Sequence, residues 1–317
     1  MKRKWIRRVS WILLTPVLLF VILMILLYIP PVQNLLRREV TAYASKATGM
    51  QIQVERIDLR FPLNLLVRGV EVIQQPDTLL SLESLNVRVQ AWPLVKGKVE
   101  VDEVTLSQVA FNSANLIEGM KIKGVLGRFF LQSHGVDLSN ELAVINQTEL
   151  SDTHVQMLMN DTTTTPKDTT ASAPVNWKVD LHKLKLKNVS FSMQLPADSM
   201  RMAAHIGEAF INDAQADLKN QFYELKQFLL SGSSANYDTG AAKPGEGFDA
   251  SHIAVRDIRI GLDSLLYKGR DMNAVIRELS MNERSGLSIT SLTGRAFSND
   301  SIIRIPGIKL QTPHSEI

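Results

Sequence analysis

The sequence predicts a mainly β fold, in which one transmembrane helix and one short amphipathic helix precede a long, coiled, bulged antiparallel β-sheet. Three observations predict it: an apolar run near the N-terminus, a helical apolar period directly after it, and a strand pattern that recurs through the remaining chain. Alternation of apolar and polar residues is typical of strands with one buried face. Its recurrence indicates one type of strand that the chain uses many times.

The first element is an apolar run, Trp11 to Ile29, whose 19 residues would form a helix about 28 Å long. That length fits the hydrocarbon core of a bilayer. Residues 1–10 hold five basic residues and no acid, so the positive-inside rule makes this stub cytoplasmic and places the rest of the chain beyond the membrane. A cleaved signal peptide is the alternative, but Tyr28 to Val32 contains no small-x-small cleavage site. We therefore expect an uncleaved, single-pass anchor at residues 11–29.

The second element is a predicted amphipathic helix at residues 32–48. The apolar residues near one face of such a helix are Val32, Leu35, Leu36, Val40, Tyr43, Ala44 and Ala47, and Gly49 supplies a C-terminal stop. Three roles are open for this helix. It plugs the near end of the β structure, lies against the outer surface of the membrane, or is a plain connector that packs on a core.

Residues 50–159 and 175–317 are predicted to be almost entirely strands, separated by turn signals. In the clearest copies of the pattern, apolar residues occupy positions 1, 3, 6, 8, 11 and 13 of a thirteen-residue window. Two copies are Val99, Val101, Val104, Leu106, Val109 and Phe111, and Val179, Leu181, Leu184, Leu186, Val189 and Phe191. A third copy runs Phe248, Ala250, Ile253, Val255, Ile258 and Ile260.

The alternation slips by one residue inside these copies, at Asp102–Glu103, Ser107–Gln108, Lys187–Asn188 and Arg256–Asp257. A β-bulge has this effect, because one extra residue returns the next apolar side chain to the same face and strengthens the twist. We therefore expect long, twisted strands with one continuous apolar face. A two-sheet sandwich needs the same alternation, so the pattern alone leaves that architecture open.

Three other segments complete the prediction. Residues 160–174 hold no aromatic and no large apolar side chain, which predicts a disordered, Thr-rich loop. The stretch from Leu218 to Leu230 is compatible with either helix or strand. Residues 302–317 begin another strand pattern, and a finished sheet rarely leaves an apolar edge uncovered. We expect the second β segment to continue beyond residue 317.

The sequence offers little for catalysis or metal binding. It has no cysteine, and its six histidines lie at least 20 residues apart, so no metal-ligand spacing is present. It contains no nucleophile elbow, phosphate loop or dinucleotide fingerprint. Without the five basic residues of the stub, 30 basic residues face 32 acidic ones, which argues against nucleic-acid binding. We expect no enzymatic activity, no metal and no cofactor.

Three stretches resemble a known family: Thr48 to Ile57, Ala91 to Val99, and Asn282 to Leu287. Together with the order of anchor, helix and bulged strands, they resemble the N-terminal region of the AsmA-like proteins over most of residues 1–317. The resemblance implies a β-taco, a coiled sheet folded into an apolar groove, that projects from the inner membrane into the periplasm of a Gram-negative bacterium. It further implies phospholipid transport between the two membranes and outer-membrane biogenesis, with membrane phospholipids and an outer-membrane barrel of the TamA type as partners.

Under this interpretation, the residues of the first two pattern copies line the groove and contact lipid acyl chains. An acyl chain gains about 0.8 kcal/mol for each CH₂ removed from water, so no specific binding residue is needed. Two other hypotheses are open. The same faces close on each other as the dry core of an assembly module that docks the barrel partner, or the chain is a periplasmic enzyme, which no residue constellation supports.

Overall fold

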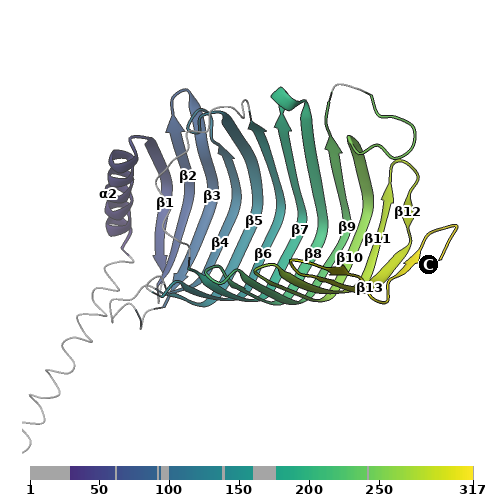
Figure 1. Ribbon diagram of the computed structural model, residues 1–317. Helices are drawn as coiled ribbons and strands as arrows, with labels where there is room; N and C mark the ends of the chain where they lie inside the picture. The colour runs from purple at the N-terminus through teal and green to yellow at the C-terminus, as the bar shows by residue number, and fades with distance from the viewer. Residues whose placement is uncertain are drawn as a thin grey trace, which may run out of the picture.

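The computed structural model describes residues 29–60, 63–90, 93, 100–137, 140–159, 176–240 and 243–316. The predicted stub and transmembrane helix fall outside these ranges, apart from Ile29, and so does the predicted loop at 160–174. Within the described ranges, no helix combines the length and the apolar character needed to cross a bilayer. The helix α2 (Pro30–Thr48) and a 3-10 turn, η1 (Pro196–Asp198), accompany one large sheet (Figure 1).

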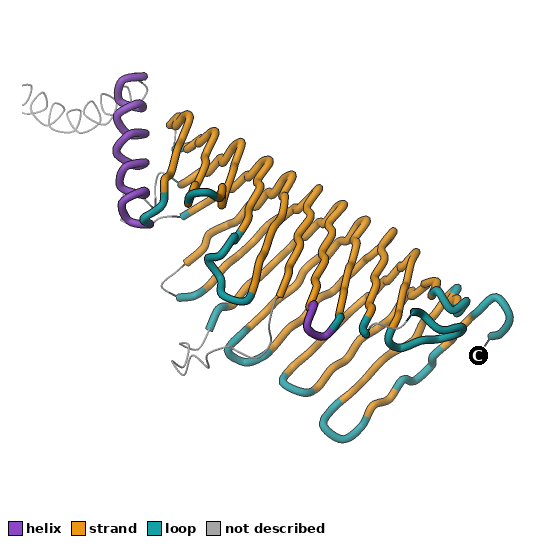
Figure 2. The backbone as a smooth tube through the Cα atoms, turned by 90° about the horizontal axis from the view of Figure 1, so that it is seen from above, coloured by secondary structure: helices purple, strands orange, loops and turns teal. Residues whose placement is uncertain are grey.

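The strands follow one another across the sheet almost in chain order, from β1 to β11 and then β13 and β14, while β12 pairs with β11 and β15 with β13. Figure 2 shows them as a row of neighbours with α2 at one end. Their bounds are β1 (Gln51–Arg60), β2 (Asn64–Gln74), β3 (Asp77–Val89), β4 (Val101–Asn112), β5 (Met120–Asp137), β6 (Leu142–Met159), β7 (Lys178–Leu195), β8 (Met200–Asp217), β9 (Phe222–Asp238), β10 (His252–Lys268), β11 (Asp271–Glu283), β12 (Ser288–Ile289), β13 (Ser291–Ser298), β14 (Ile303–Arg304) and β15 (Lys309–Gln311).

The structure decides between the two β architectures that the pattern left open. The described strands form one open sheet, so the sandwich is wrong. The two predicted β segments are parts of this same sheet, because β6 pairs with β7. That pair is parallel, whereas a wholly antiparallel sheet was predicted. Parallel neighbours need a long crossover, and residues 160–177 between β6 and β7 supply its length.

A line of irregular residues crosses the sheet from β1 to β10, and we call it the upper bend line. Each strand pair interrupts its ladder at this level. From β1 to β8 one position is skipped, for example between Leu82↔Val109 and Ser84↔Ser107, and the pairs from β8 to β11 skip more than one residue. The positions are Glu55, Gly69, Glu83, Gln108, Gly127, Asp152, Asn188, Gly207, Gly232 and Asp257. Gln108, Asp152, Asn188 and Asp257 have φ of 50° to 55°, the left-handed conformation that Asn and Asp tolerate best.

A second line, the lower bend line, crosses β4 to β11. It includes Asp102, which the β3–β4 ladder skips, and Asp213, whose φ is 50°. Asp213 Oδ1 lies 3.2 Å from His182 Nδ1, and Asp213 Oδ2 lies 3.9 Å from Lys226 Nζ. Polar side chains therefore link the three neighbouring strands β7, β8 and β9 there. Figure 1 shows the result, long strands that curve along their length in place of a flat sheet.

The bend lines confirm the slips predicted from sequence. Gln108, Asn188 and Asp257 lie on the upper line and Asp102 on the lower one. Lys187–Asn188 and Arg256–Asp257 are successive exposed residues, as expected when an insertion keeps apolar neighbours on one face. The start of the third pattern copy is wrong, however. Phe248 and Ala250 precede β10, and Phe248 is 66% exposed, because the chain there forms the β9–β10 loop.

Helix α2 lies beside the free edge of β1 (Figure 1). Two of its side chains bond to the backbone of this edge strand: Ser45 Oγ accepts from Ile52 N at 3.0 Å, and Arg37 Nη1 donates to the carbonyl of Glu55 at 2.7 Å. Gly49 ends the helix in the left-handed conformation, as predicted. The helix thus covers an edge that would otherwise offer unpaired backbone groups to another chain. The predicted apolar side chains Leu35, Val40 and Tyr43 remain exposed.

The close approach of backbones at the upper bend line gives a stability prediction. A Cβ at Gly207 would lie 2.6 Å from the carbonyl oxygen of Gly232, and backbone cannot yield as a flexible side chain does. We expect Gly207→Ala to lower the free energy of unfolding by about 1–3 kcal/mol, the range typical of overpacking. Urea denaturation followed by circular dichroism measures it.

The matched control is Gly245→Ala, since the nearest atom to a Cβ there is Asp249 Oδ2 at 3.8 Å. Equal stability of the two variants would show that the bend line has room for a side chain.

Candidate functional site

The central feature of the sheet is an unbroken row of apolar residues that crosses eleven strands, from β1 to β11. Each member is the ladder partner of the next, so neighbouring side chains lie on the same face. We call it the middle row. Its members are Ile57, Val67, Leu85, Leu106, Phe129, Leu150, Leu186, Ala209, Leu230, Ile260 and Leu279. At about 4.8 Å between strands, ten steps give a path of about 48 Å.

Parallel rows flank the middle row on both sides. The row across the upper bend line is Val54, Val70, Leu82, Val109, Leu126, Thr153, Val189 and Ile206. The next row is Ile52, Val72, Leu80, Phe111, Gly124, Val155, Phe191, Ala204, Ala235 and Val255. On the other side lie Leu59, Leu65, Val87, Val104, Leu131, Thr148, Leu184, Ile211, Phe228, Leu262 and Ile276.

These rows bring the two predicted sets of site residues together. Leu106 and Leu186 share the middle row, while Val109 and Val189, Phe111 and Phe191, and Val104 and Leu184 share the flanking rows. Val101, Val179 and Leu181 lie farther along β4 and β7. Val99 falls outside the described residues. The predicted residues are thus corresponding positions of two strands that β5 and β6 separate.

Polar interruptions of the rows are satisfied locally. Thr153 Oγ1 donates to the carbonyl of Ser151 at 3.1 Å, and Thr148 Oγ1 donates to the carbonyl of Phe130 at 3.1 Å. A hydroxyl that is already bonded to backbone presents its methyl group at little cost. The rows therefore remain apolar in character at both threonines.

No second layer covers this apolar face within the part of the chain that the structure describes, because all its strands belong to one sheet and α2 lies at the β1 edge. Accordingly, no large side chain in the described ranges is less than 2% exposed. Phe191, Met202, Tyr223 and Tyr267 are 37% to 39% exposed. Apolar surface that is this continuous and this open is typical of a binding surface.

The face is most buried where it bends. Leu82 and Val109, paired beside the upper bend line, are 7% and 8% exposed, and Ala209 of the middle row is 2% exposed. Side chains on the inside of a bend crowd one another, whereas those on the outside spread apart. This burial fits an apolar face that lies on the inside of the bend.

A hollow of ≈ 230 Å³ lies on the same face, between β7, β8, β9 and β10. Val179, Leu181, Ala214 and Leu225 are among its walls. Ala214 of β8 pairs with Leu181 of β7 and with Leu225 of β9, and its small side chain leaves the depression. At about 30 Å³ for a water-sized group, the hollow has room for roughly seven such groups.

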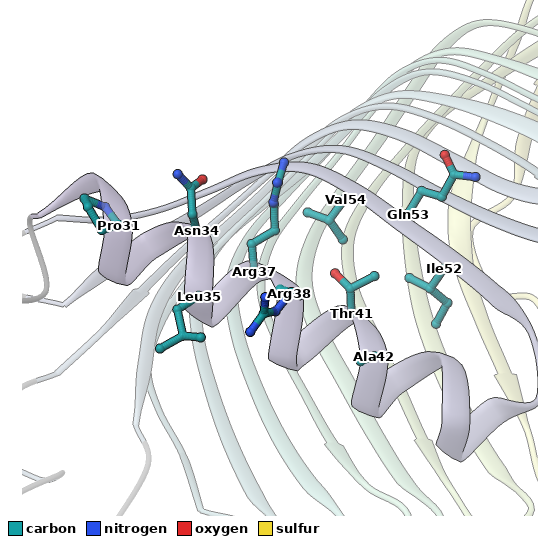
Figure 3. Close-up of a pocket in the computed structure, with 10 residues that line it drawn as sticks. All are labelled: Pro31, Asn34, Leu35, Arg37, Arg38, Thr41, Ala42, Ile52, Gln53 and Val54. Atoms are coloured by element: carbon teal, nitrogen blue, oxygen red, sulfur yellow. The ribbon is translucent and has the colours of Figure 1, made fainter.

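A second concavity, of ≈ 840 Å³, separates α2 from β1. We call it the α2–β1 cleft. Figure 3 shows the side chains that line it: Pro31, Asn34, Leu35, Arg37, Arg38, Thr41 and Ala42 from α2, and Ile52, Gln53 and Val54 from β1. Ile52 and Val54 are the β1 members of two apolar rows. The cleft therefore meets the apolar face at its β1 end.

The carboxyl groups with a lowered pKa accept hydrogen bonds from residues of turns and loops. Hydrogen bonds from Ser285, first from its side chain, hold the pKa of Glu283 below its ordinary value. The backbone N–H of Gly245, followed by that of Ser251, lowers the pKa of Asp249. The Asn220 side chain lowers that of Asp217. In the described ranges, no three His, Asp or Glu side chains gather as a metal site would require.

Sequence reasoning predicted the segments beside β4 and β7 as strands but named no site residues on them. Their signal was present but weaker, because Ala, Thr and Ser replace larger residues at the same spacing. On β8 the pattern is Ala204, Ile206, Ala209, Ile211, Ala214 and Ala216, and on β9 it is Tyr223, Leu225, Phe228, Leu230, Ser233 and Ala235. The ambiguous stretch from Leu218 thus enters strand β9 at Phe222. The apolar pattern of the sequence does not predict the cleft, because the cleft depends on how α2 packs beside β1.

Compared with known proteins, the chain matches no family model and no curated protein. Its function must therefore be argued from the geometry of the apolar face and the cleft.

The lowered pKa values predict acid sensitivity. A carboxyl whose folded-state pKa is below its unfolded value of about 4 stabilises the fold above that pH, and the contribution is lost as pH falls through the folded value. We expect the urea midpoint to drop between about pH 5 and pH 3, and Glu283→Gln to lower stability at neutral pH and flatten this dependence. The control is Glu246→Gln, an exposed acid of the β9–β10 loop. A Glu283→Gln profile parallel to that of the unmodified chain would contradict the assignment.

Proposed function

We propose that this chain is an inner-membrane-anchored periplasmic protein of the AsmA-like family, of the TamB (translocation and assembly module) type. Its concave apolar β-face forms the groove of a β-taco and holds phospholipid acyl chains on their way between the inner and outer membranes. The observation that carries the proposal is the middle row, which is apolar on every strand from β1 to β11 and is left uncovered by the described elements.

The direction of the rows supports a path rather than a single pocket. They run across the strands, so an acyl chain moving along the sheet meets apolar side chains at each step. Removing a CH₂ from water is worth about 0.8 kcal/mol wherever along the row it occurs. Lipid therefore needs no specific binding residue and meets no charged side chain in the middle row. The upper bend line supports the groove, because it interrupts β1 to β10 at the same level.

The second candidate is an assembly module that docks an outer-membrane barrel partner of the TamA type through a dry β core. The exposed apolar residues at the β13–β15 end of the sheet favour docking there. Ile303 is 78% exposed, Ile305 49% and Ile308 40%. Against a dry core stands the exposure of Phe191 and Met202 on the apolar face itself. The proposed anchor at residues 11–29 serves either function.

Lipid binding is tested by extracting and identifying lipids from the full chain purified from membranes. We expect copurified phospholipid, and we expect Leu186→Asp to reduce it at least tenfold, because a carboxylate in the middle row must be desolvated when an acyl chain covers it. The matched control is Ser192→Asp, which adds the same charge on the opposite face of the same strand.

The two candidates differ in what Leu186→Asp does to folding. Leu186 is only partly buried on an open face, so the variant should keep its circular dichroism spectrum and its urea midpoint within about 1 kcal/mol of the control. Unfolding of the variant would favour the dry core. A folded, unmodified chain without any bound lipid would reject the proposed function.

A further inference from the structure

We infer that the α2–β1 cleft is a phospholipid headgroup site, at which a lipid leaving the bilayer is held while its acyl chains pass onto the apolar face. The inference rests on the proposed function and adds to it a place, a ligand class and the residues concerned. The lining of the cleft combines polar side chains with the apolar Ile52 and Val54 of β1, as an amphipathic ligand requires.

The position of the cleft suits a lipid that has just left the membrane. α2 starts at Pro30, directly after the apolar run predicted to span the bilayer. Arg38 is nine residues beyond Ile29, or about 14 Å along a helix. Pro31, Asn34 and Leu35 of the first two turns line the cleft. Its lining thus begins within reach of the headgroup layer above the predicted anchor.

The two arginines of the cleft have different partners. Arg37 is held by its bond to the carbonyl of Glu55, at 2.7 Å, and points toward β1 (Figure 3). Arg38 pairs with Glu39 at 3.6 Å, with side chains that are 75% and 67% exposed. Such a pair is weak in water, so Arg38 can exchange it for a phosphate oxygen. Arg37 therefore fixes the cleft wall and Arg38 supplies a cation.

Uncharged polar groups complete the lining. Thr41 Oγ1 is buried and has no hydrogen-bond partner, a state that costs free energy until a ligand or water supplies one. The amide side chains of Asn34 and Gln53 also line the cleft. Together with Arg38 they can bond the oxygens of a phosphodiester, and Arg38 complements its negative charge.

The apolar side of the cleft is continuous with two apolar rows of the sheet. Ile52 pairs with Val72, and Val54 pairs with Val70, so each opens one of the apolar rows. A lipid whose phosphate lies at Arg38 can place its acyl chains on these two rows. The chains then cross no charged residue of β1, because Glu55 follows Val54 and lies on the upper bend line. Headgroup binding and transfer of the chains are thus adjacent steps.

The test uses the full chain in liposomes that contain a phospholipid with a photoreactive group in its headgroup. Cross-linked peptides are mapped by mass spectrometry. We expect cross-links within residues 31–54, and about a tenfold lower yield there for Arg38→Gln, as for the loss of a charge-assisted hydrogen bond. The control is Lys46→Gln, which removes the same charge from an exposed position of α2 outside the cleft.

A second pair of variants tests the space and leaves the charge unchanged. Ala42→Trp fills the cleft, whereas Ala47→Trp adds the same bulk at an exposed position of α2 that does not line it. We expect only Ala42→Trp to lower the headgroup cross-links and the amount of copurified lipid. Both variants should keep the circular dichroism spectrum of the unmodified chain.

The outcomes separate the inference from the function on which it rests. Copurified lipid with cross-links confined to β5–β10, or equal losses for Arg38→Gln and Lys46→Gln, would reject the headgroup site and leave the proposed function standing. Inorganic phosphate that abolishes the cross-links at equimolar concentration would reassign the cleft to free phosphate. A chain that carries no lipid and gives no cross-link would reject both.

Discussion

The upper bend line is the constraint on which the remaining structure depends. A strand of strict alternation that curved this strongly would either lose its ladder or rotate its apolar side chains out of register. One residue in a left-handed or otherwise irregular conformation, placed at the same level on each strand, solves both problems. It takes up the curvature, and it returns the following side chain to the face that its predecessors occupy. Asn188 and Asp257 fill this position at low cost because their side chains tolerate positive φ.

Because the bends coincide from β1 to β10, side chains that are distant in sequence lie in one continuous row. Leu106 and Leu186 are eighty residues apart, yet only Phe129 and Leu150 separate them in the middle row. The stability of such a sheet comes from its ladders and from lateral contacts between rows, since a one-layer structure encloses little. Among the few buried apolar residues, Leu82 and Ala209 lie beside the upper bend line. The exposed rows remain accessible to a ligand or partner.

The sequence was sufficient to predict the strand type, the slips and one face of β4 and β7, since these depend on local alternation. It was insufficient for the neighbours of those strands. The apolar positions of β8 are largely alanine, which a search for large side chains passes over, and β6 carries Thr148 and Thr153 there. The parallel pairing of β6 with β7 depends on which end of the sheet the chain returns to, and the composition of residues 160–174 holds no such information. Phe248 fitted the pattern by coincidence, because a loop residue followed the same spacing.

The geometry also bears on how lipid could move. In a closed pocket, a ligand that leaves must give up all its contacts before it gains others. Under the proposed function, an acyl chain that advances along the rows by one strand exchanges one apolar neighbour for another, such as Leu230 for Ile260, while most of its length stays covered. The barrier to a step is then a small part of the total binding free energy, which is how a tight association can still permit movement. A single charged side chain in the row would raise that barrier by the cost of desolvating a charge. The absence of charged residues from all eleven middle-row positions is therefore the property that a path needs and an ordinary half-exposed sheet does not.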